Sequence, residues 1–150
     1  MLPRMAHTNA VQRQLLRYMD GQGDPPKYRF GGMAPALARL RKAGLLNGNE
    51  LTGFGKEVLC TESKLTFGKA DPYHCGWDGW RDRIEVYLDG EHVGDLAGSG
   101  QNKRQMSYGL RTHNPLLKDY PAIARPIGIK AAKAAIRTAL TVRAAIVRGA

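Results

Sequence analysis

A short run of cationic side chains at helical spacing is the first feature of this sequence that could do chemistry. Arg39, Arg41 and Lys42 lie in the segment 36–46, among leucines and alanines, and Gly44 interrupts the run. Guanidinium and ammonium groups neutralise phosphates, and a guanidinium can also donate two hydrogen bonds to the edge of a guanine. The segment therefore predicts contact with nucleic acid through these three residues. A solvated face of a packing helix is the alternative interpretation.

A second set of cations lies near the C-terminus, in a segment rich in alanine. At about 100° per residue, the basic residues fall on one side of a helix and large aliphatic residues fall on another. The basic set is Lys130, Lys133, Arg137 and Arg148, and the aliphatic set is Ile129, Ile136, Leu140 and Val147. The stripe predicts a helix that follows phosphates, with a dimerisation helix or a solvated cover over a sheet as alternatives. Arg143 falls near the aliphatic side, where it needs a partner or must extend to solvent.

The charge of the chain favours polyanionic partners and is unevenly distributed. The formal net charge of the 150 residues is +10. Residues 1–50 hold eight Lys or Arg against three Asp or Glu, residues 51–100 five against nine, and residues 101–150 ten against one. Two basic ends around an acidic middle are typical of phosphate-facing surfaces on a neutralising scaffold. We predict a nucleic-acid partner, with DNA preferred over RNA.

Composition also narrows the cellular context. No apolar run approaches the roughly 20 residues of a membrane span, and the first residues lack the apolar stretch of a signal peptide. Two cysteines, Cys60 and Cys75, do not make a disulfide framework in a chain of this length. We therefore expect a cytoplasmic protein with no membrane partner.

Catalytic and metal chemistry have weaker support in the sequence. His74 is adjacent to Cys75, but no second pair follows at the spacing of a zinc site. A metal-dependent nuclease could use two or three carboxylates of the acidic middle. These acids are Asp78, Asp82, Glu85, Asp89, Glu91 and Asp95. Their position around a predicted hairpin favours a solvated surface, so we predict no catalytic residue, no metal and no cofactor. Trp77 and Trp80 could stack on bases, but packing in the core or at an interface is the favoured interpretation.

The elements that must position the first cations are short helices. Helices are predicted over about 9–19, 33–43 and 52–61, with an extended piece at 27–30. Gly44 caps the end of the second helix, and Thr52 caps the start of the third. Residues 47–49 then form a tight polar turn between the second and third helices.

Three pieces of this N-terminal region occur in a characteristic order. They are a helix with Leu15-Leu16, the ending Leu40-Arg41-Lys42-Ala43-Gly44-Leu45-Leu46, and the opening Leu51-Thr52-Gly53-Phe54-Gly55. In this order, residues 9–62 resemble winged helix-turn-helix DNA-binding domains. The resemblance implies that the 33–43 helix enters a major groove and that the turn after it is a short wing. It also implies that Arg39, Arg41 and Lys42 face phosphates or base edges.

The second half of the chain changes from helical to strand periodicity. Residues 63–80 are predicted to be a linker or loop, and alternation begins near Arg81. Asp89-Gly90 predicts a hairpin turn. A third strand near 105–110, an irregular segment over 112–126 and a helix from about 126 to 148 follow. The order of hairpin, strand and basic helix is also similar to part of the double-stranded-RNA-binding domain.

These observations predict an α+β protein with two parts. A winged-helix-like unit occupies 1–62, and a β-hairpin or small sheet with a long basic C-terminal helix occupies 81–150. The predicted function is non-enzymatic binding of double-stranded DNA by a small regulator or accessory factor, which could dimerise through the C-terminal helix. An adaptor or inhibitor that docks on an acidic protein or a ribonucleoprotein is one alternative. A small metal-dependent nuclease is the other.

Overall fold

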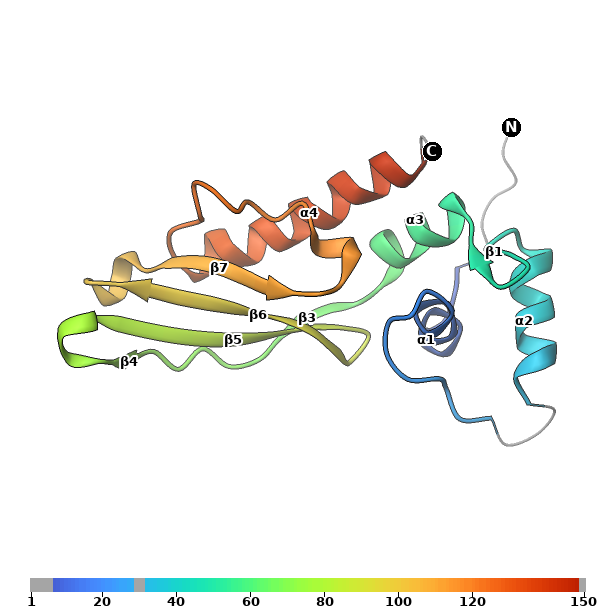
Figure 1. Cartoon of the computed structure of the whole chain (residues 1–150), viewed down its shortest axis with the longest axis horizontal. Helices are drawn as coiled ribbons and strands as arrows, with labels where there is room; N and C mark the ends of the chain where they lie inside the picture. Colours follow the sequence, from blue (N-terminus) through green and yellow to red (C-terminus); the bar gives the residue numbers. More distant parts are fainter. Residues whose placement is uncertain (1–6, 29–31, 149–150) are drawn as a thin grey trace. The chain divides into compact units, whose positions relative to one another are not determined.

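The computed structural model describes residues 7–28 and 32–148, which divide into two compact units (Figure 1). Unit 1 comprises residues 1–63 together with residues 144–150, and unit 2 comprises residues 64–143. Helices and antiparallel strands are both present, so the predicted α+β class is confirmed. The last turn of the C-terminal helix belongs to unit 1, a grouping that the sequence did not indicate. Residues 29–30 of the predicted extended piece lie outside the described residues.

The first helix of unit 1, α1 (Ala10–Met19), begins at a capping box. The Asn9 side chain accepts a hydrogen bond from the Gln12 backbone N–H at 2.8 Å, and the Gln12 side chain accepts one from the Asn9 N–H at 2.9 Å. The backbone N–H groups of Asn9 and Gln12 have no carbonyl partner within the helix, and these side chains pair them. The pairing favours initiation of the helix at Asn9. Leu15 and Leu16 of α1 are fully buried and anchor it in the core of the unit.

A short hairpin follows the second helix of unit 1. Helix α2 (Met33–Lys42) ends before Gly44, whose φ of +80° lets the chain reverse. The strands β1 (Leu46–Asn47) and β2 (Glu50–Leu51) then pair antiparallel. The turn predicted at 47–49 is thus the tip of a two-stranded hairpin.

The third helix, α3 (Gly53–Glu62), returns from this hairpin to the core. The Thr52 side chain caps it by accepting a hydrogen bond from the Gly55 N–H at 3.0 Å, as predicted. Val58 and Leu59 are fully buried. A Cβ atom at Gly55 would overlap the Leu45 carbonyl, so the absence of a side chain permits close packing of α3 on the start of the hairpin.

Unit 2 contains an antiparallel sheet of five strands. The strands are β3 (Leu65–Phe67), β4 (Tyr73–His74), β5 (Trp80–Leu88), β6 (Glu91–Gly100) and β7 (Ser107–Thr112). Their order across the sheet is β3-β5-β6-β7, and β4 also pairs with β5. The predicted linker at 63–80 is therefore wrong, because it contains β3 and β4. These strands are three and two residues long, too short for alternation to reveal them.

The hairpin between β5 and β6 is confirmed. Asp89 and Gly90 have φ values of +50° and +81°, and Leu88 pairs with Glu91 across them. Two successive residues at positive φ are typical of a type I′ turn, whose twist matches that of the flanking strands. The local pair Asp89-Gly90 therefore fixes the register of β5 and β6 next to the turn, and an irregularity between Val86 and Tyr87 shifts the register farther along the strands.

The two faces of this sheet differ because successive side chains of a strand point to opposite sides. Ile84 and Val86 of β5 and Leu96 of β6 are fully buried on one face. The C-terminal helix α4 (Ile129–Arg148) runs alongside this face and buries Ile136 (Figure 1). The opposite face, called the outer face below, carries the side chains that alternate with these buried residues.

Short 3-10 turns lie between β4 and β5, between β6 and β7, and after β7. They are η1 (Gly76–Asp78), η2 (Lys103–Gln105) and η3 (Pro115–Leu117). Apart from η3, the segment predicted to be irregular at 112–126 contains only the end of β7. Among the described residues, no helix is both long and apolar enough to cross a membrane.

Candidate nucleic-acid interface

Arg39, Arg41 and Lys42 form an exposed cationic group at the end of α2, called the α2 surface below. Arg41 is tied to the hairpin that follows. Its Nε donates to the Gly48 carbonyl at 2.8 Å, and its Nη2 donates to the Asn49 side-chain oxygen at 2.8 Å. The guanidinium thus fixes the tip of the β1–β2 hairpin against the helix while remaining exposed.

The other two members of the α2 surface are held differently. Arg39 lines a hollow of about 140 Å³ whose other walls include Gln12 of α1 and Tyr28. Lys42 is exposed at the last residue of the helix. No residue of α2 is acidic. Within the described part of the chain, neither Arg39 nor Lys42 forms an ion pair with a carboxylate, so both charges remain available to a phosphate.

Three of the predicted cations of α4 form a second group, the α4 ridge, which comprises Lys130, Lys133 and Arg137. The Lys133 Nζ lies 5.1 Å from the centroid of the Phe67 ring, and the Arg137 Cζ lies 5.8 Å from it. A cation over an aromatic face is held electrostatically. Phe67 of β3 therefore orients two neighbouring charges, and Lys130 is exposed one turn before them.

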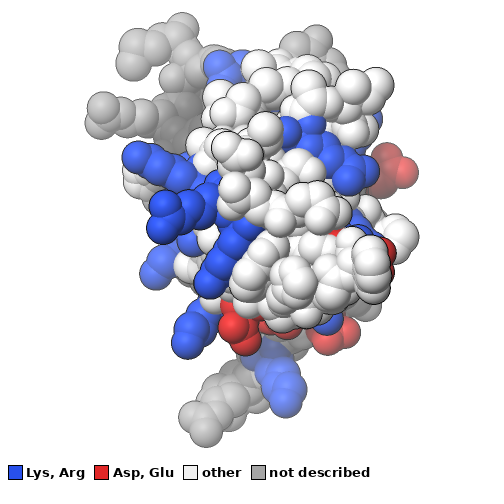
Figure 2. Space-filling view, turned by 90° about the vertical axis from the view of Figure 1, so that its left-hand side faces the viewer, with Lys and Arg blue, Asp and Glu red and all other residues white. Residues whose placement is uncertain are grey.

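Figure 2 shows the end of the molecule that carries β4, with most Lys and Arg side chains in view along the left of the near face and a smaller group at the upper right. Few Asp or Glu side chains lie among them, and those in view lie mostly toward the lower and right-hand margins. A cluster of positive charges raises the local concentration of polyanions.

Arg148 does not belong with the α4 ridge, although the helical wheel placed it on the same side. It lies in unit 1, where its Nη2 is 2.8 Å from the Glu57 Oε1 of α3. This carboxylate neutralises the charge of Arg148. The wheel predicted only the direction of the side chain and carried no information about an acid from another helix.

The acids of the middle block lie on opposite faces of the sheet. Asp82 is buried on the α4 side, where it accepts hydrogen bonds from the Tyr108 hydroxyl at 3.1 Å and the Arg83 N–H at 2.8 Å. Asp95 lies on the outer face, 3.3 Å from the Arg83 guanidinium and 2.9 Å from the His92 ring. In the described ranges, no group of three or more His, Cys, Asp or Glu side chains could hold a metal ion.

Trp77 does not pack in the core, so of the two predicted kinds of packing only an interface remains open for it. This residue lies on η1 and its side chain is 100% exposed. Trp80 is partly buried, and the Lys103 Nζ lies 5.1 Å from its ring centroid. The two residues differ because Trp80 belongs to a paired strand whereas Trp77 lies in the turn before it.

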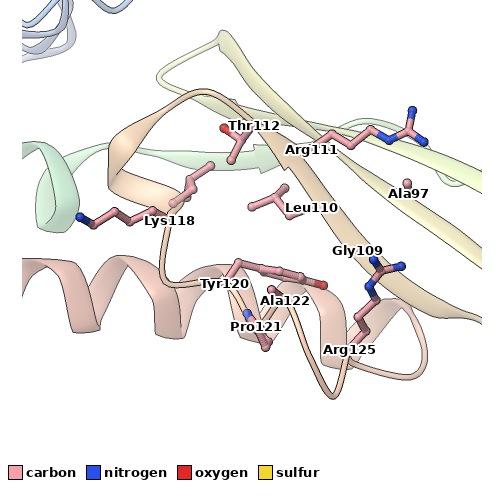
Figure 3. Close-up of a pocket in the computed structure, with 11 residues that line it drawn as sticks. Ala97, Gly109, Leu110, Arg111, Thr112, Lys118, Tyr120, Pro121, Ala122 and Arg125 are labelled. Carbon is pink, nitrogen blue, oxygen red and sulfur yellow. The ribbon is translucent and has the colours of Figure 1, made fainter.

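A pocket of about 400 Å³ in unit 2 is lined by cationic residues that the sequence did not identify as candidates (Figure 3). Arg111, Lys118 and Arg125 line it, together with Tyr120 and Ala97. The excess of ten basic residues over one acid in 101–150 was visible in the sequence. These three residues line one pocket because the irregular segment folds back on β7, and no local sequence pattern predicts that fold.

No family model matches the chain, and neither the curated proteins nor the solved structures with which it was compared gave a match. The resemblance to winged helix-turn-helix domains therefore stays a prediction that depends on the residues themselves.

Proposed function

We propose that the protein binds double-stranded DNA through the α2 surface and acts as a small regulator or accessory factor, without a chemical step of its own. The observation that carries this proposal is the coupling of α2 to the β1–β2 hairpin through Arg41. A cationic helix held beside a hairpin can contact a groove and the adjoining backbone together. Arg39 and Lys42 are then the groups directed at phosphates or base edges.

The α4 ridge supplies a second, sequence-independent contribution in this proposal. Lys133 and Arg137 are held over Phe67 as charges rather than as hydrogen-bond donors aimed at one acceptor. Such charges interact with any phosphate that comes within reach, so they raise affinity for all sequences alike. We also propose a cytoplasmic location, which is supported by the lack of a disulfide between buried Cys60 and exposed Cys75.

The test is fluorescence anisotropy with labelled duplex DNA over a salt series. Log affinity should fall linearly with log salt, by about 0.9 for each phosphate contacted. Arg39→Ala should also narrow the difference in affinity between a selected site and random duplex by about 1–3 kcal/mol. Lys64→Ala, an exposed cation outside both surfaces, is the charge-matched control and should change little.

The α4 ridge has a different expected signature. Lys130→Ala and Lys133→Ala should weaken binding to all duplexes equally and flatten the salt slope by about one unit each. If the protein binds no nucleic acid even at low salt, the proposal is wrong, and docking on an acidic protein becomes the favoured interpretation of these cations.

A further inference from the structure

The segment that follows η3 is fastened to the edge strand β7 at both of its ends. The Tyr120 hydroxyl donates to the Tyr108 carbonyl at 2.6 Å. The Tyr108 N–H donates to the Pro126 carbonyl at 2.9 Å, and the Gly128 N–H donates to the Met106 carbonyl at 2.9 Å. Residues 120–128 therefore form a loop whose two ends are held against the same strand.

This loop places the guanidinium of Arg125 against β7. Ala124 has a φ of +55°, which is uncommon for a residue with a side chain and costs conformational energy. Arg125 follows directly, and its Cζ would lie 3.2 Å from a Cβ atom built at Gly109 of β7. The absence of a side chain at Gly109 thus leaves the space that the Arg125 guanidinium occupies.

Arg125 and Arg111 line the same pocket, which contains no acidic residue. In Figure 3 the two guanidinium groups lie toward the same end of the pocket, near Ala97, whereas the Lys118 ammonium points away from them. Asp95 is opposite Arg111 in the β6–β7 register, but its carboxylate is engaged by Arg83 and His92. Over the described residues, neither arginine forms an ion pair with a carboxylate.

The rest of the pocket is largely apolar and offers a backbone donor. Leu110, Leu117 and Pro121 contribute to its wall. Tyr108 turns its N–H and carbonyl away from β6, toward the loop. In an antiparallel strand, the backbone N–H groups of every second residue point to the same side. The Leu110 N–H therefore also points away from β6, toward the pocket that Leu110 lines.

Arg111 and Arg125 place two positive charges on one pocket, on either side of Ala97 in Figure 3, so an anion bound between them would be attracted by both. Guanidinium groups match phosphate oxygens with paired hydrogen bonds, and an apolar wall beside such a pair suits the sugar and base of a nucleotide. The volume is within the range of about 300–1,000 Å³ that is usual for small-molecule sites. We propose that this pocket binds a phosphate-bearing nucleotide, with its phosphate held by Arg111 and Arg125. The proposal does not depend on DNA binding by the α2 surface.

The test is calorimetric titration of the full chain with the four nucleoside 5′-monophosphates, the matching nucleosides and inorganic phosphate. At least one monophosphate should bind about tenfold or more tightly than its nucleoside and than inorganic phosphate. Arg111→Ala and Arg125→Ala should each weaken that binding by about tenfold or more. Arg104→Ala, which removes an exposed arginine of η2 that lies outside the pocket lining, should leave it unchanged.

Gly109→Ala provides a variant that keeps every charge. Its Cβ should displace Arg125 and weaken monophosphate binding, while a thermal melt close to that of the wild type shows that the sheet is intact. A 5′-phosphorylated single-stranded oligonucleotide and its unphosphorylated counterpart identify the source of the nucleotide. If the phosphorylated strand binds, the unphosphorylated strand does not, and Arg125→Ala abolishes the binding, the proposal is supported and the ligand is the 5′ end of a strand.

Three results would overturn the proposal. The first is no binding of any monophosphate or phosphorylated strand. The second is binding that survives both arginine substitutions unchanged. The third is equal affinity for inorganic phosphate and nucleotide, because the apolar wall would then contribute nothing.

Discussion

The Asp119 carboxylate accepts two hydrogen bonds from the Arg143 guanidinium, at 2.7 Å from Nε and 2.8 Å from Nη2. The side chains are only 22% and 12% exposed, respectively. Asp119 is the single acid among residues 101–150, and it follows η3, whereas Arg143 lies on α4. This pair neutralises the one α4 cation that the helical wheel placed near the apolar side, and it joins the irregular segment to the helix.

Removing one partner of this pair should destabilise the protein. Asp119→Asn leaves a largely buried guanidinium without its carboxylate, so the free energy of unfolding should fall by about 1–3 kcal/mol. Urea denaturation of the two single variants and of Asp119→Asn with Arg143→Met measures the coupling between them. A coupling energy near zero would contradict a structural role for the pair.

Acid stability should depend on Asp95. Partial burial opposes ionisation, but hydrogen bonds from His92 and Arg83 and their charges outweigh it and lower the pKa of Asp95 below its usual value of 3.8. A depressed carboxyl pKa stabilises the fold above the unfolded-state value, and this contribution is lost as pH falls through the folded-state value. The wild type should therefore lose its stability advantage over Asp95→Asn as the pH is lowered below about 4.

Melting temperatures of both proteins between pH 7 and pH 2 provide the measurement for Asp95. His92→Gln is the matched variant, because it keeps a hydrogen-bonding side chain but cannot carry the positive charge. A gap between wild type and Asp95→Asn that stays constant across this range would show that Asp95 is not stabilised by its neighbours.

The two tryptophans should respond differently to a quencher. Trp77 is 100% exposed, whereas Trp80 is partly buried beside His74 and Lys103. Each can be observed alone, in Trp80→Phe and Trp77→Phe, since the chain has no other tryptophan. Acrylamide, which is neutral and so insensitive to nearby cations, should quench Trp77 several-fold more strongly than Trp80. Equal quenching of the two variants would contradict the exposure of the η1 turn.

Much of the fold was predictable because its signals are local. Asn9 and Thr52 cap helices through residues three positions away, and Asp89-Gly90 determines a turn by its own backbone preference. The strands β3 and β4 were missed for the opposite reason. Their hydrogen-bonding partners lie on β5, and a strand of two or three residues has too few alternating positions to be recognised.

The candidate surfaces show the same division between local and distant information. The helical wheel predicted the direction of Lys130, Lys133 and Arg137 correctly relative to buried Ile136. It could not show that Phe67 lies beneath two of them, nor that Glu57 takes up the charge of Arg148. Direction follows from helical geometry, whereas partners follow from tertiary packing.

The assignment of residues 144–150 to unit 1 has a consequence for synthesis on the ribosome. Domains generally fold as units while the chain emerges from its N-terminus. Residues 1–63 leave the ribosome first, but Arg148, which pairs with Glu57, is translated only after the whole of residues 64–143. The nascent first unit therefore stays incomplete until the second unit has been translated. A fragment cut at residue 63 would reproduce that unfinished state.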